Sequence, residues 1–572
     1  LLRSLRRKGL DYVLLPLSGS FPERTPRRDP LPFPFNRLLL LPSETSLEDM
    51  RAVVERIGKD HRVRGAVFRF DALRAGPAAL HSLRRLILEL RAQGKRTVAW
   101  LPTADTWDYY LASACEEIVI PASGHLFALG LRAETTFLKD ALALVGVEAD
   151  LEAIAEYKVT PDTFRRSTMS EPHREMLDAL LDSYFDEVVT AIAQGRGLDE
   201  AQVRELIDRM PLTAAEAVEA GLADAVLYED QLAAHLPPPA DLAGRPDQAD
   251  RPDSPDEDVP SPPASTVPLL TWEESERWLR RPIKWTTRQR IGVVSLEGMI
   301  VPGRSRRVPV PLPLPFEAQA GAETLTQALR RAEADERIAA VILHVESPGG
   351  SALASDLIWR EVRRLRERKP VVVLMGQQAA SGGYYVAAPA NHIVARPTTL
   401  TGSIGIWGGK PVLRGLYEKL GLNREAIQRG AMAGLYSETT PFSPEERAWV
   451  RRNMGQEYAR FKARVAAGRG MAEEDVEKIA RGRVWSGAQA LEINLVDELG
   501  DFGTALAKAK ALAGLDPERE YTVVHVQPPR QELPARPFPV EEPTWAMLLD
   551  TLQDLAHERV WALAPWTLRV RG

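Results

Sequence analysis

A serine in a turn of small residues is the first candidate for chemistry. Ser381 lies in the segment GQQAASGGYYVAAPA, directly after the apolar run Val371–Met375. A strand that ends in such a turn before a helix exposes a hydroxyl at the positive end of the helix dipole, which favours a nucleophile. Gly382 can then bring its N–H close to a substrate carbonyl oxygen without steric conflict. Taken alone, the turn is also consistent with a purely structural role.

A second glycine turn could complete an oxyanion hole. The apolar run Ala339–Val345 ends in Glu-Ser-Pro-Gly-Gly-Ser at 346–351. If the two strands are neighbours in a parallel sheet, N–H groups of Gly349 or Gly350 and of Gly382 converge on one oxygen. A plain connecting turn is the alternative.

The serine needs a general base, and histidine is the usual one. Nine histidines are present, but none has a persuasive sequence context. His344 falls in a predicted buried strand, whereas His392 opens the next strand and is kept as a minor rival. A lysine is the other option, provided that burial keeps its amine neutral.

An internal duplication is visible when the sequence is slid against itself by 275 positions. Residues 106–130 then lie over residues 381–405. After a slip of two residues, the Gly-Arg-Gly at 195–197 lies over the Gly-Arg-Gly at 468–470. Two matching blocks in the same order indicate two repeats.

The duplication selects a lysine. Thr106 takes the place of Ser381 in the first repeat, while Lys158, in AIAEYKVTPDTF, lies opposite Ala433 or Ala431 of the second. Each repeat keeps what the other has lost, as expected if a Ser-Lys unit was duplicated and each copy kept one partner. We therefore predict one site across the repeats, with Ser381 as nucleophile and Lys158 as general base.

The elements that must position these residues read as an α/β fold. Strands are predicted at Gly292–Leu296, Ala339–Val345, Val371–Met375 and His392–Ala395, with helices at Leu325–Ala334 and Ala354–Arg366. Strands alternating with helices predict parallel βαβ units.

The domain organisation follows from the duplication and from one biased segment. Residues 237–266 contain nine prolines and seven acidic residues and cannot bury a core. We predict a first repeat at 1–236, a linker at 237–268, a second repeat at 269–515 and an extension at 516–572. Within these, 308–316 is expected to be an exposed loop and 543–562 an amphipathic helix.

Composition excludes several classes of protein. The net charge of -6 and the pI near 6.0 provide no basic surface for nucleic acid. The single cysteine, Cys115, cannot form an internal disulfide or a zinc site with other thiols, and it lies in a predicted helix, Tyr109–Cys115. No apolar run reaches the ~18 to 20 residues of a membrane-spanning helix. The chain begins at Leu1 rather than Met, which leaves a preceding signal or anchor open.

These motifs resemble the signal peptide peptidase A family of Ser-Lys peptidases, in its long, two-repeat form. The matching segments are SPGGS at 347–351, AASGGYY at 379–385, LTGSIGI at 400–406 and EYKVTPDTF at 156–164. The resemblance implies a ClpP/crotonase-like fold in each repeat, the Ser-Lys pair above, oxyanion donors at Gly382 and the 349–350 turn, and Ser403 as the residue that orients the lysine. The chain departs from the family at Gln377 and Gln378, where an acidic residue and a serine are frequent.

The resemblance also implies a setting for the enzyme. It predicts a bowl-shaped homotetramer that needs no metal or organic cofactor and degrades cleaved signal peptides and other apolar or unfolded peptides. It further predicts peripheral membrane association at the outer, non-cytoplasmic face of a bacterial inner membrane. Two rival functions are a crotonase-type acyl-CoA hydratase or isomerase, which needs no nucleophilic serine, and a catalytically silent scaffold.

Overall fold

The chain forms two compact units. The computed structural model describes residues 10–25, 45–237, 267–280, 287–307, 318–528, 560–563 and 569–571. Unit 1 comprises Leu1–Leu131, Phe185–Lys284 and Gly572, and unit 2 comprises Arg132–Tyr184 and Trp285–Arg571. Residues 132–184 of the first repeat therefore group with the second repeat. The repeat boundaries stay a prediction, and most of the predicted linker and the loop at 308–316 lie outside the described residues.

Unit 2 is built on a sheet with the strand order β22-β20-β18-β16-β12-β24. Its central strands are β12 (Arg290–Glu297), β16 (Ile338–Ser347) and β18 (Val371–Ala380), which pair in parallel, and β19 (His392–Ala395) also pairs with β18. The remaining strands are β20 (Leu400–Gly402), β22 (Val484–Ser486), β23 (Glu498–Leu499) and β24 (Thr522–His525). The four predicted strands are confirmed.

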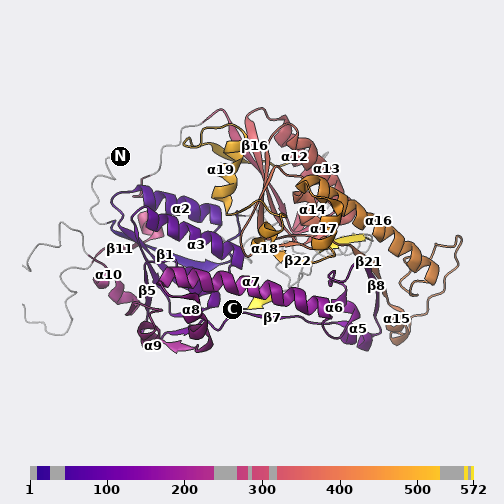
Figure 1. Cartoon of the computed structure of the whole chain (residues 1–572), viewed down its shortest axis with the longest axis horizontal. Coiled ribbons are helices and arrows are strands. Elements are labelled where there is room, and N and C mark those ends of the chain that lie inside the picture. Colours follow the sequence, from indigo (N-terminus) through magenta and orange to yellow (C-terminus); the bar gives the residue numbers. More distant parts are fainter. Residues whose placement is uncertain are drawn as a thin grey trace, which may run out of the picture. The chain divides into compact units, whose positions relative to one another are not determined.

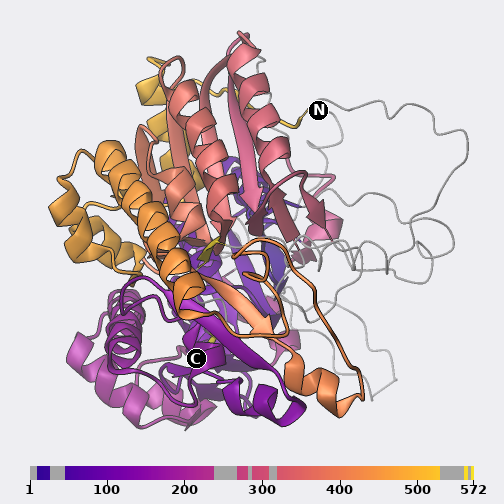
Figure 2. The same cartoon turned by 90° about the vertical axis from the view of Figure 1, so that its right-hand side faces the viewer.

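Helices cover both faces of this sheet. α12 (Ala322–Ala334) and α13 (Ala352–Arg366) pack on one face, and α19 (Phe502–Leu512) packs on the other (Figure 1). The run Val371–Met375 is fully buried, as expected for a parallel strand covered on both sides. Helix α16 (Pro444–Arg469), the long orange helix in Figure 2, begins with a Ser443–Glu446 capping box and ends at Gly470 in the left-handed conformation. The predicted βαβ architecture is confirmed.

A second sheet in unit 2 has the order β14-β15-β13-β17-β25-β21-β8. Its strands are β14 (Arg306–Arg307), β15 (Ala318–Gly321), β13 (Met299–Val301), β17 (Gly349–Ser351), β25 (Val560–Leu563), β21 (Trp407–Val412) and β8 (Glu148–Ala153). β8, from the first repeat, pairs antiparallel with β21 over six residues. Through this pairing, residues 132–184 of the first repeat become part of unit 2.

The carboxyl end of the chain corrects one prediction. The helix expected over 543–562 is wrong at its end, because Val560–Leu563 forms strand β25 between β17 and β21. Both neighbours offer unpaired backbone groups that an extended segment satisfies. The rest of the predicted helix lies outside the described residues.

Unit 1 repeats the same design on a parallel sheet. Its order is β10-β5-β3-β2-β1-β11. The strands are β1 (Tyr12–Gly19), β2 (Gly65–Leu73), β3 (Arg96–Trp100), β5 (Glu117–Ile120), β10 (Ala225–Val226) and β11 (Leu269–Thr271), and the helices include α2 (Leu47–Lys59), α3 (Pro77–Ala92), α4 (Thr106–Ala112), α8 (Glu200–Asp208) and α9 (Ala214–Glu219). Helix α7 runs from Glu171 to Arg196. Cys115 is fully buried beyond the end of α4, and burial raises the pKa of its thiol to about 12.

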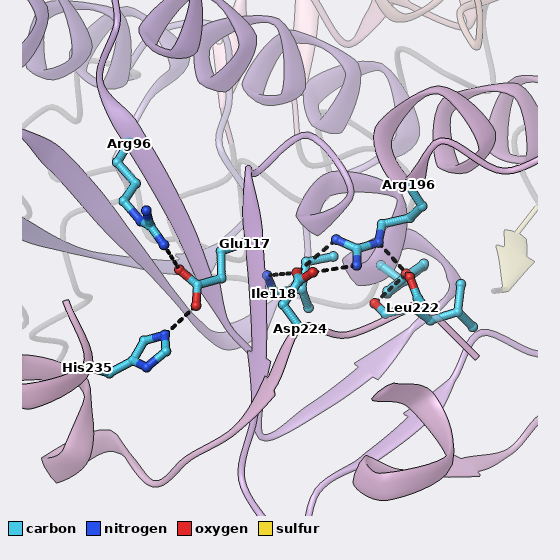
Figure 3. Close-up of polar contacts among 9 residues, drawn as sticks. Arg96, Glu117, Ile118, Arg196, Leu222, Asp224 and His235 are labelled. Atoms are coloured by element: carbon cyan, nitrogen blue, oxygen red, sulfur yellow. Dashed lines mark hydrogen bonds and ion pairs between the residues drawn. The ribbon is translucent and has the colours of Figure 1, made fainter. Parts of the chain in front are cut away.

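The first two residues of the Gly-Arg-Gly in the first repeat make specific contacts. Arg196 forms a two-pronged ion pair with Asp224 at 2.8 and 2.9 Å, and Asp224 also accepts the N–H of Ile118 (Figure 3). A Cβ at Gly195 would lie 2.0 Å from the carbonyl oxygen of Ser113, so only glycine fits there. These contacts tie α7 to β5.

The second Gly-Arg-Gly makes the same contacts. Arg469 pairs with Asp497 at 2.6 and 2.9 Å, and Asp497 accepts the N–H of Ile393 at 2.8 Å. A Cβ at Gly468 would lie 2.2 Å from the carbonyl oxygen of Ala388. The two repeats therefore share their fold as well as their sequence pattern.

Candidate active site

Ser381 lies at the junction of β18 and the short helix α14 (Gly382–Ala387). Its backbone has φ 55° and ψ -114°, a left-handed conformation that is strained for any residue except glycine. The N–H of Ser381 donates to the carbonyl of Gly402 at 2.8 Å, while its hydroxyl makes no capping bond to α14. A sharp strand-to-helix turn whose serine hydroxyl does not cap the helix is the geometry of a nucleophile elbow.

Lys158 is held in a loop that follows β8. The N–H of Ile154 donates to the carbonyl of Ile406 at 2.9 Å, and the N–H of Tyr157 donates to that of Arg481 at 3.1 Å. A Cβ at Gly482 would lie 2.5 Å from the backbone nitrogen of Lys158, so the loop passes directly over a glycine. This path places Lys158 Nζ 2.8 Å from Ser381 Oγ.

The surroundings of Lys158 favour a neutral amine. The residue is 2% exposed, and burial lowers its pKa well below the usual range of lysine. A neutral amine has two N–H donors and one lone pair. Its nitrogen lies within hydrogen-bonding distance of three oxygens, which are Ser381 Oγ at 2.8 Å, the Ser403 hydroxyl at 3.0 Å and the Ser403 carbonyl at 3.1 Å. The structure thus brings Ser381, Lys158 and Ser403 together.

The glycine turn after β16 lies beside Ser381. Ser347 is in register with Ala379 of β18, and a Cβ at Gly383 would meet the Ser347 carbonyl oxygen at 2.9 Å. Gly349 has φ 104°, and its N–H donates to Ser347 Oγ at 3.1 Å. The turn and the first residues of α14 are therefore adjacent, although the Gly349 N–H already has a partner in this conformation.

Gly350 is required at its position by a close approach of strands. It pairs with Ile300 of β13, and a Cβ there would lie 2.0 Å from the Ile300 carbonyl oxygen. Strand β17 therefore stays flat against β13.

The rival histidine lies at the far end of the strand. His392 is in register with Val372, near the amino end of β18, whereas Ser381 follows the carboxyl end. Between Val372 and Ala379 the paired strand β16 advances five residues, from Ile342 to Ser347, which corresponds to ~16 Å, and Ser381 lies two residues further on. His392 bonds Glu498 at 3.0 Å instead, and His344 is buried within β16 as predicted. The structure does not bring either histidine to Ser381.

Thr106, which replaces Ser381 in the first repeat, uses its hydroxyl locally. Its Oγ1 donates to the carbonyl of Gly130 at 2.9 Å and accepts the Gly130 N–H at 3.2 Å. The Thr106 side chain is therefore engaged with the backbone.

One charged residue beside the site was missed by sequence reasoning. Glu346 precedes the glycine turn, and its carboxylate accepts the N–H groups of Gln377 and Gln378 at 2.6 and 3.3 Å. The available signal was an acidic residue at the end of an otherwise apolar strand.

The part of the chain that the structure describes has no group of three or more His, Cys, Asp or Glu side chains that could hold a metal ion. Nor does a helix within the described ranges have the length and apolar character needed to cross a membrane.

Comparisons with known proteins identify the family of the chain. A family model described as Peptidase family S49 matches the chain twice, over residues 89–242 and 363–516. The chloroplastic serine protease SPPA of Arabidopsis thaliana is 32% identical over 494 residues, covering 86% of this chain and 69% of that protein. Protease 4 of Haemophilus influenzae is 28% identical over 495 residues, covering 85% of this chain and 75% of that protein.

Among solved structures, a ClpP1 mutant from Listeria monocytogenes matches with a TM-score of 0.25 and 16% identity, covering 37% of this chain and 94% of that one. The decisive finding is the family model, because its two copies span more than half of the chain. The chain belongs to peptidase family S49 and is a serine protease.

Proposed function

We propose that this protein is an endopeptidase with a Ser-Lys dyad, in which Ser381 is the nucleophile and Lys158 the general base. The observation that carries the proposal is the 2.8 Å separation of Ser381 Oγ from Lys158 Nζ, an amine whose pKa burial lowers. A buried neutral lysine can accept the serine proton at neutral pH. Ser403 orients that amine through its carbonyl and its hydroxyl.

The proposed reaction has two steps. Ser381 Oγ attacks the peptide carbonyl while Lys158 takes its proton, and Lys158 then gives this proton to the leaving amine. Water deacylates the enzyme with Lys158 again as base. The N–H of Gly382 and those of the Gly349–Gly350 turn are the proposed oxyanion donors, so Gly349 must exchange its bond to Ser347 for one to substrate.

Strand pairing at the site supports an extended peptide as substrate. Gly349–Ser351 of β17 pairs antiparallel with Ala562 and its neighbours in β25, which also pairs with Trp407 and Gly408 of β21. The edge beside the glycine turn thus accepts an extended chain by main-chain pairing, a mode of peptide recognition that tolerates many sequences. A substrate would take the same edge, so β25 and substrate are mutually exclusive.

The finer parts of the proposal concern substrate and assembly. We infer that cleaved signal peptides and other apolar peptides at or near a membrane are the substrates, and that the enzyme is a bowl-shaped homotetramer of ClpP/crotonase-like repeats at the outer face of a bacterial inner membrane. Exposed apolar side chains in unit 2 support an interface, among them Leu144 at 78% and Ile427 at 91%. Sedimentation of the wild type and of Ile427→Asp tests the assembly, because a tetramer held by this surface should dissociate.

The test of the dyad is hydrolysis of a fluorogenic peptide with a small or apolar residue before the scissile bond. Ser381→Ala and Lys158→Ala should each lose nearly all turnover while staying folded. Lys369→Ala is the matched control, since Lys369 is also a partly buried lysine with a lowered pKa but precedes the opposite end of β18. Near-normal activity of Lys158→Ala would refute the dyad.

A fluorophosphonate probe separates the proposal from its rivals. The probe should label the wild type at Ser381 and leave Ser381→Ala unlabelled. An acyl-CoA hydratase or a silent scaffold would not be labelled, because neither needs an activated serine.

A further inference from the structure

The strand that leads to Ser381 contains a large bulge. Val345 of β16 is in register with Met375 of β18, but Ser347 is in register with Ala379. Glu346 alone therefore lies opposite three residues, Gly376 to Gln378. Such a bulge redirects a strand and leaves backbone groups outside the ladder, and these need other partners.

Glu346 supplies the acceptors for this bulge. Its two carboxylate oxygens accept the N–H groups of Gln377 at 2.6 Å and Gln378 at 3.3 Å. A Cβ at Gly376 would lie 2.0 Å from Glu346 Oε2, so the carboxylate fills the space that a side chain would need. Glu346 therefore contacts the backbone of Gln377 and Gln378.

Three other side chains donate hydrogen bonds to backbone carbonyl groups in and beside the bulge. Arg396 donates to the carbonyl of Met375, and the hydroxyl of Thr399 donates to that of Gly376 at 2.8 Å. The hydroxyl of Thr401 donates to the carbonyl of Ala379 at 2.8 Å. Glu346 is the acidic member of this set.

The bulge sets the register of everything that follows it. After the bulge, Gln378 to Ala380 pair with Leu400 to Gly402 of β20. In that register the Ser381 N–H donates to the Gly402 carbonyl, and Ser403, the residue that follows β20, contacts Lys158 Nζ with its carbonyl and its hydroxyl. A change in the bulge would therefore shift the nucleophile against the lysine and its anchor.

We propose that Glu346 is a positioning residue of the catalytic site, whose ionised carboxylate fixes the bulge before Ser381 and so sets the distance between Ser381 Oγ and Lys158 Nζ. This inference rests on the proposed Ser-Lys mechanism. If Glu346 has this role, loss of activity at low pH follows the protonation of two groups, Glu346 and Lys158.

The groups that face Glu346 define this ionisation. The pKa of Glu346 is raised to about 7, chiefly by burial and to a smaller extent by the charge of Glu297, against the lowering effect of the Gln377 and Gln378 N–H groups and of Arg396. Glu297 lies in register with Glu346 on the adjacent strand β12. The ionised form, and with it the arranged bulge, is present above pH ~7 and is lost as the pH falls through that value.

The first test is Glu346→Gln, which keeps the size of the side chain but places an amide donor against a backbone N–H. We expect kcat for peptide hydrolysis to fall ~10- to 100-fold with KM within about twofold, since a small misplacement of reacting groups acts on the chemical step. At pH values below the pKa of both Glu346 and Lys158, log(kcat/KM) of the wild type should approach a slope of two against pH, and that of Glu346→Gln a slope of one. An unchanged kcat or an unchanged slope would overturn the proposal.

Glu297→Gln keeps the test decisive if Glu346→Gln does not fold. It leaves Glu346 in place and removes the charge that raises its pKa, so the acid limb should move to lower pH with kcat at its plateau unchanged. An acid limb that stays in place would count against the role of Glu346. Ser381→Ala and Lys158→Ala, assayed alongside, distinguish failure of the Glu346 proposal from failure of the Ser-Lys mechanism. If both variants retain activity, the Ser-Lys dyad is rejected. If both lose activity while Glu346→Gln keeps the wild-type kcat and pH slope, only the positioning role of Glu346 is rejected.

Discussion

Replacing Lys158 by methionine should make the protein inactive and, near neutral pH, more stable than the wild type. Methionine fills the same pocket without an amine. In the unfolded chain Lys158 is protonated up to pH ~10.4, whereas burial lowers its pKa well below that in the folded state. Between the folded-state pKa of Lys158 and pH ~10.4, the unfolded wild type therefore binds one more proton than the folded wild type. The free energy of unfolding of the wild type consequently rises with pH in this range.

The magnitude follows from that one proton. The free energy of unfolding of the wild type should rise by about 1.4 kcal/mol per pH unit relative to Lys158→Met, hence by about 2 kcal/mol between pH 8 and pH 9.5. Other titrating groups are shared by the two proteins and cancel in the difference. At pH 8 the loss of the bonds to Ser381 and Ser403 opposes the gain, with about 0.5 to 1.5 kcal/mol for each bond, but those bonds do not change the slope.

The assay is denaturant unfolding of both proteins at several pH values, together with peptide hydrolysis. Ser381→Ala is the matched control, because it removes the nucleophile but keeps the buried lysine and should follow the wild-type slope. A stability difference that is constant from pH 8 to pH 9.5 would mean that Lys158 is charged in the folded protein. The general-base role would then be refuted, whatever the activity of the variant.

Three further outcomes are expected. Ser403→Ala should lower kcat ~2- to 10-fold with little change in KM, because the amine keeps the Ser403 carbonyl but loses the hydroxyl; steady-state kinetics measures it. Gly350→Ala should abolish activity and lower the thermal midpoint, since its Cβ would lie 2.0 Å from the Ile300 carbonyl oxygen; calorimetry and hydrolysis together check it. Deleting residues 529–572, which include β25, should lower KM for long peptides ~5- to 150-fold with kcat unchanged, if docking of β25 is worth about 1 to 3 kcal/mol; an unchanged KM would show that substrate does not use the edge of β17.

The central parallel strands could be predicted from the sequence. The runs around Val371–Met375 and Ala339–Val345 are long, apolar and bounded by glycine turns, and both form central parallel strands. Strand β25 was assigned to a helix because its neighbours on both sides come from distant parts of the chain. Pairing of that kind leaves no periodic signal in the segment itself.

Some residues of the candidate site could likewise be identified from the sequence, and others could not. Ser381 could be found from its turn, and Lys158 only by comparing the repeats, because an isolated lysine in a loop has no distinguishing pattern. The sequence marks Glu346 only as an acidic residue at the end of an apolar run, because its contacts arise from two extra residues in the facing strand and register is a property of the folded sheet.

Lys158 comes from the first repeat and Ser381 from the second, and different strand pairings position them. Lys158 belongs to a segment of unit 2 whose strand β8 pairs with β21 over six residues, so main-chain hydrogen bonds as well as side-chain packing position this lysine. Ser381 is positioned by an independent device, the bulge held by Glu346. The 2.8 Å contact between them therefore depends on two separate registers, and a change in either one should reduce kcat without unfolding the other.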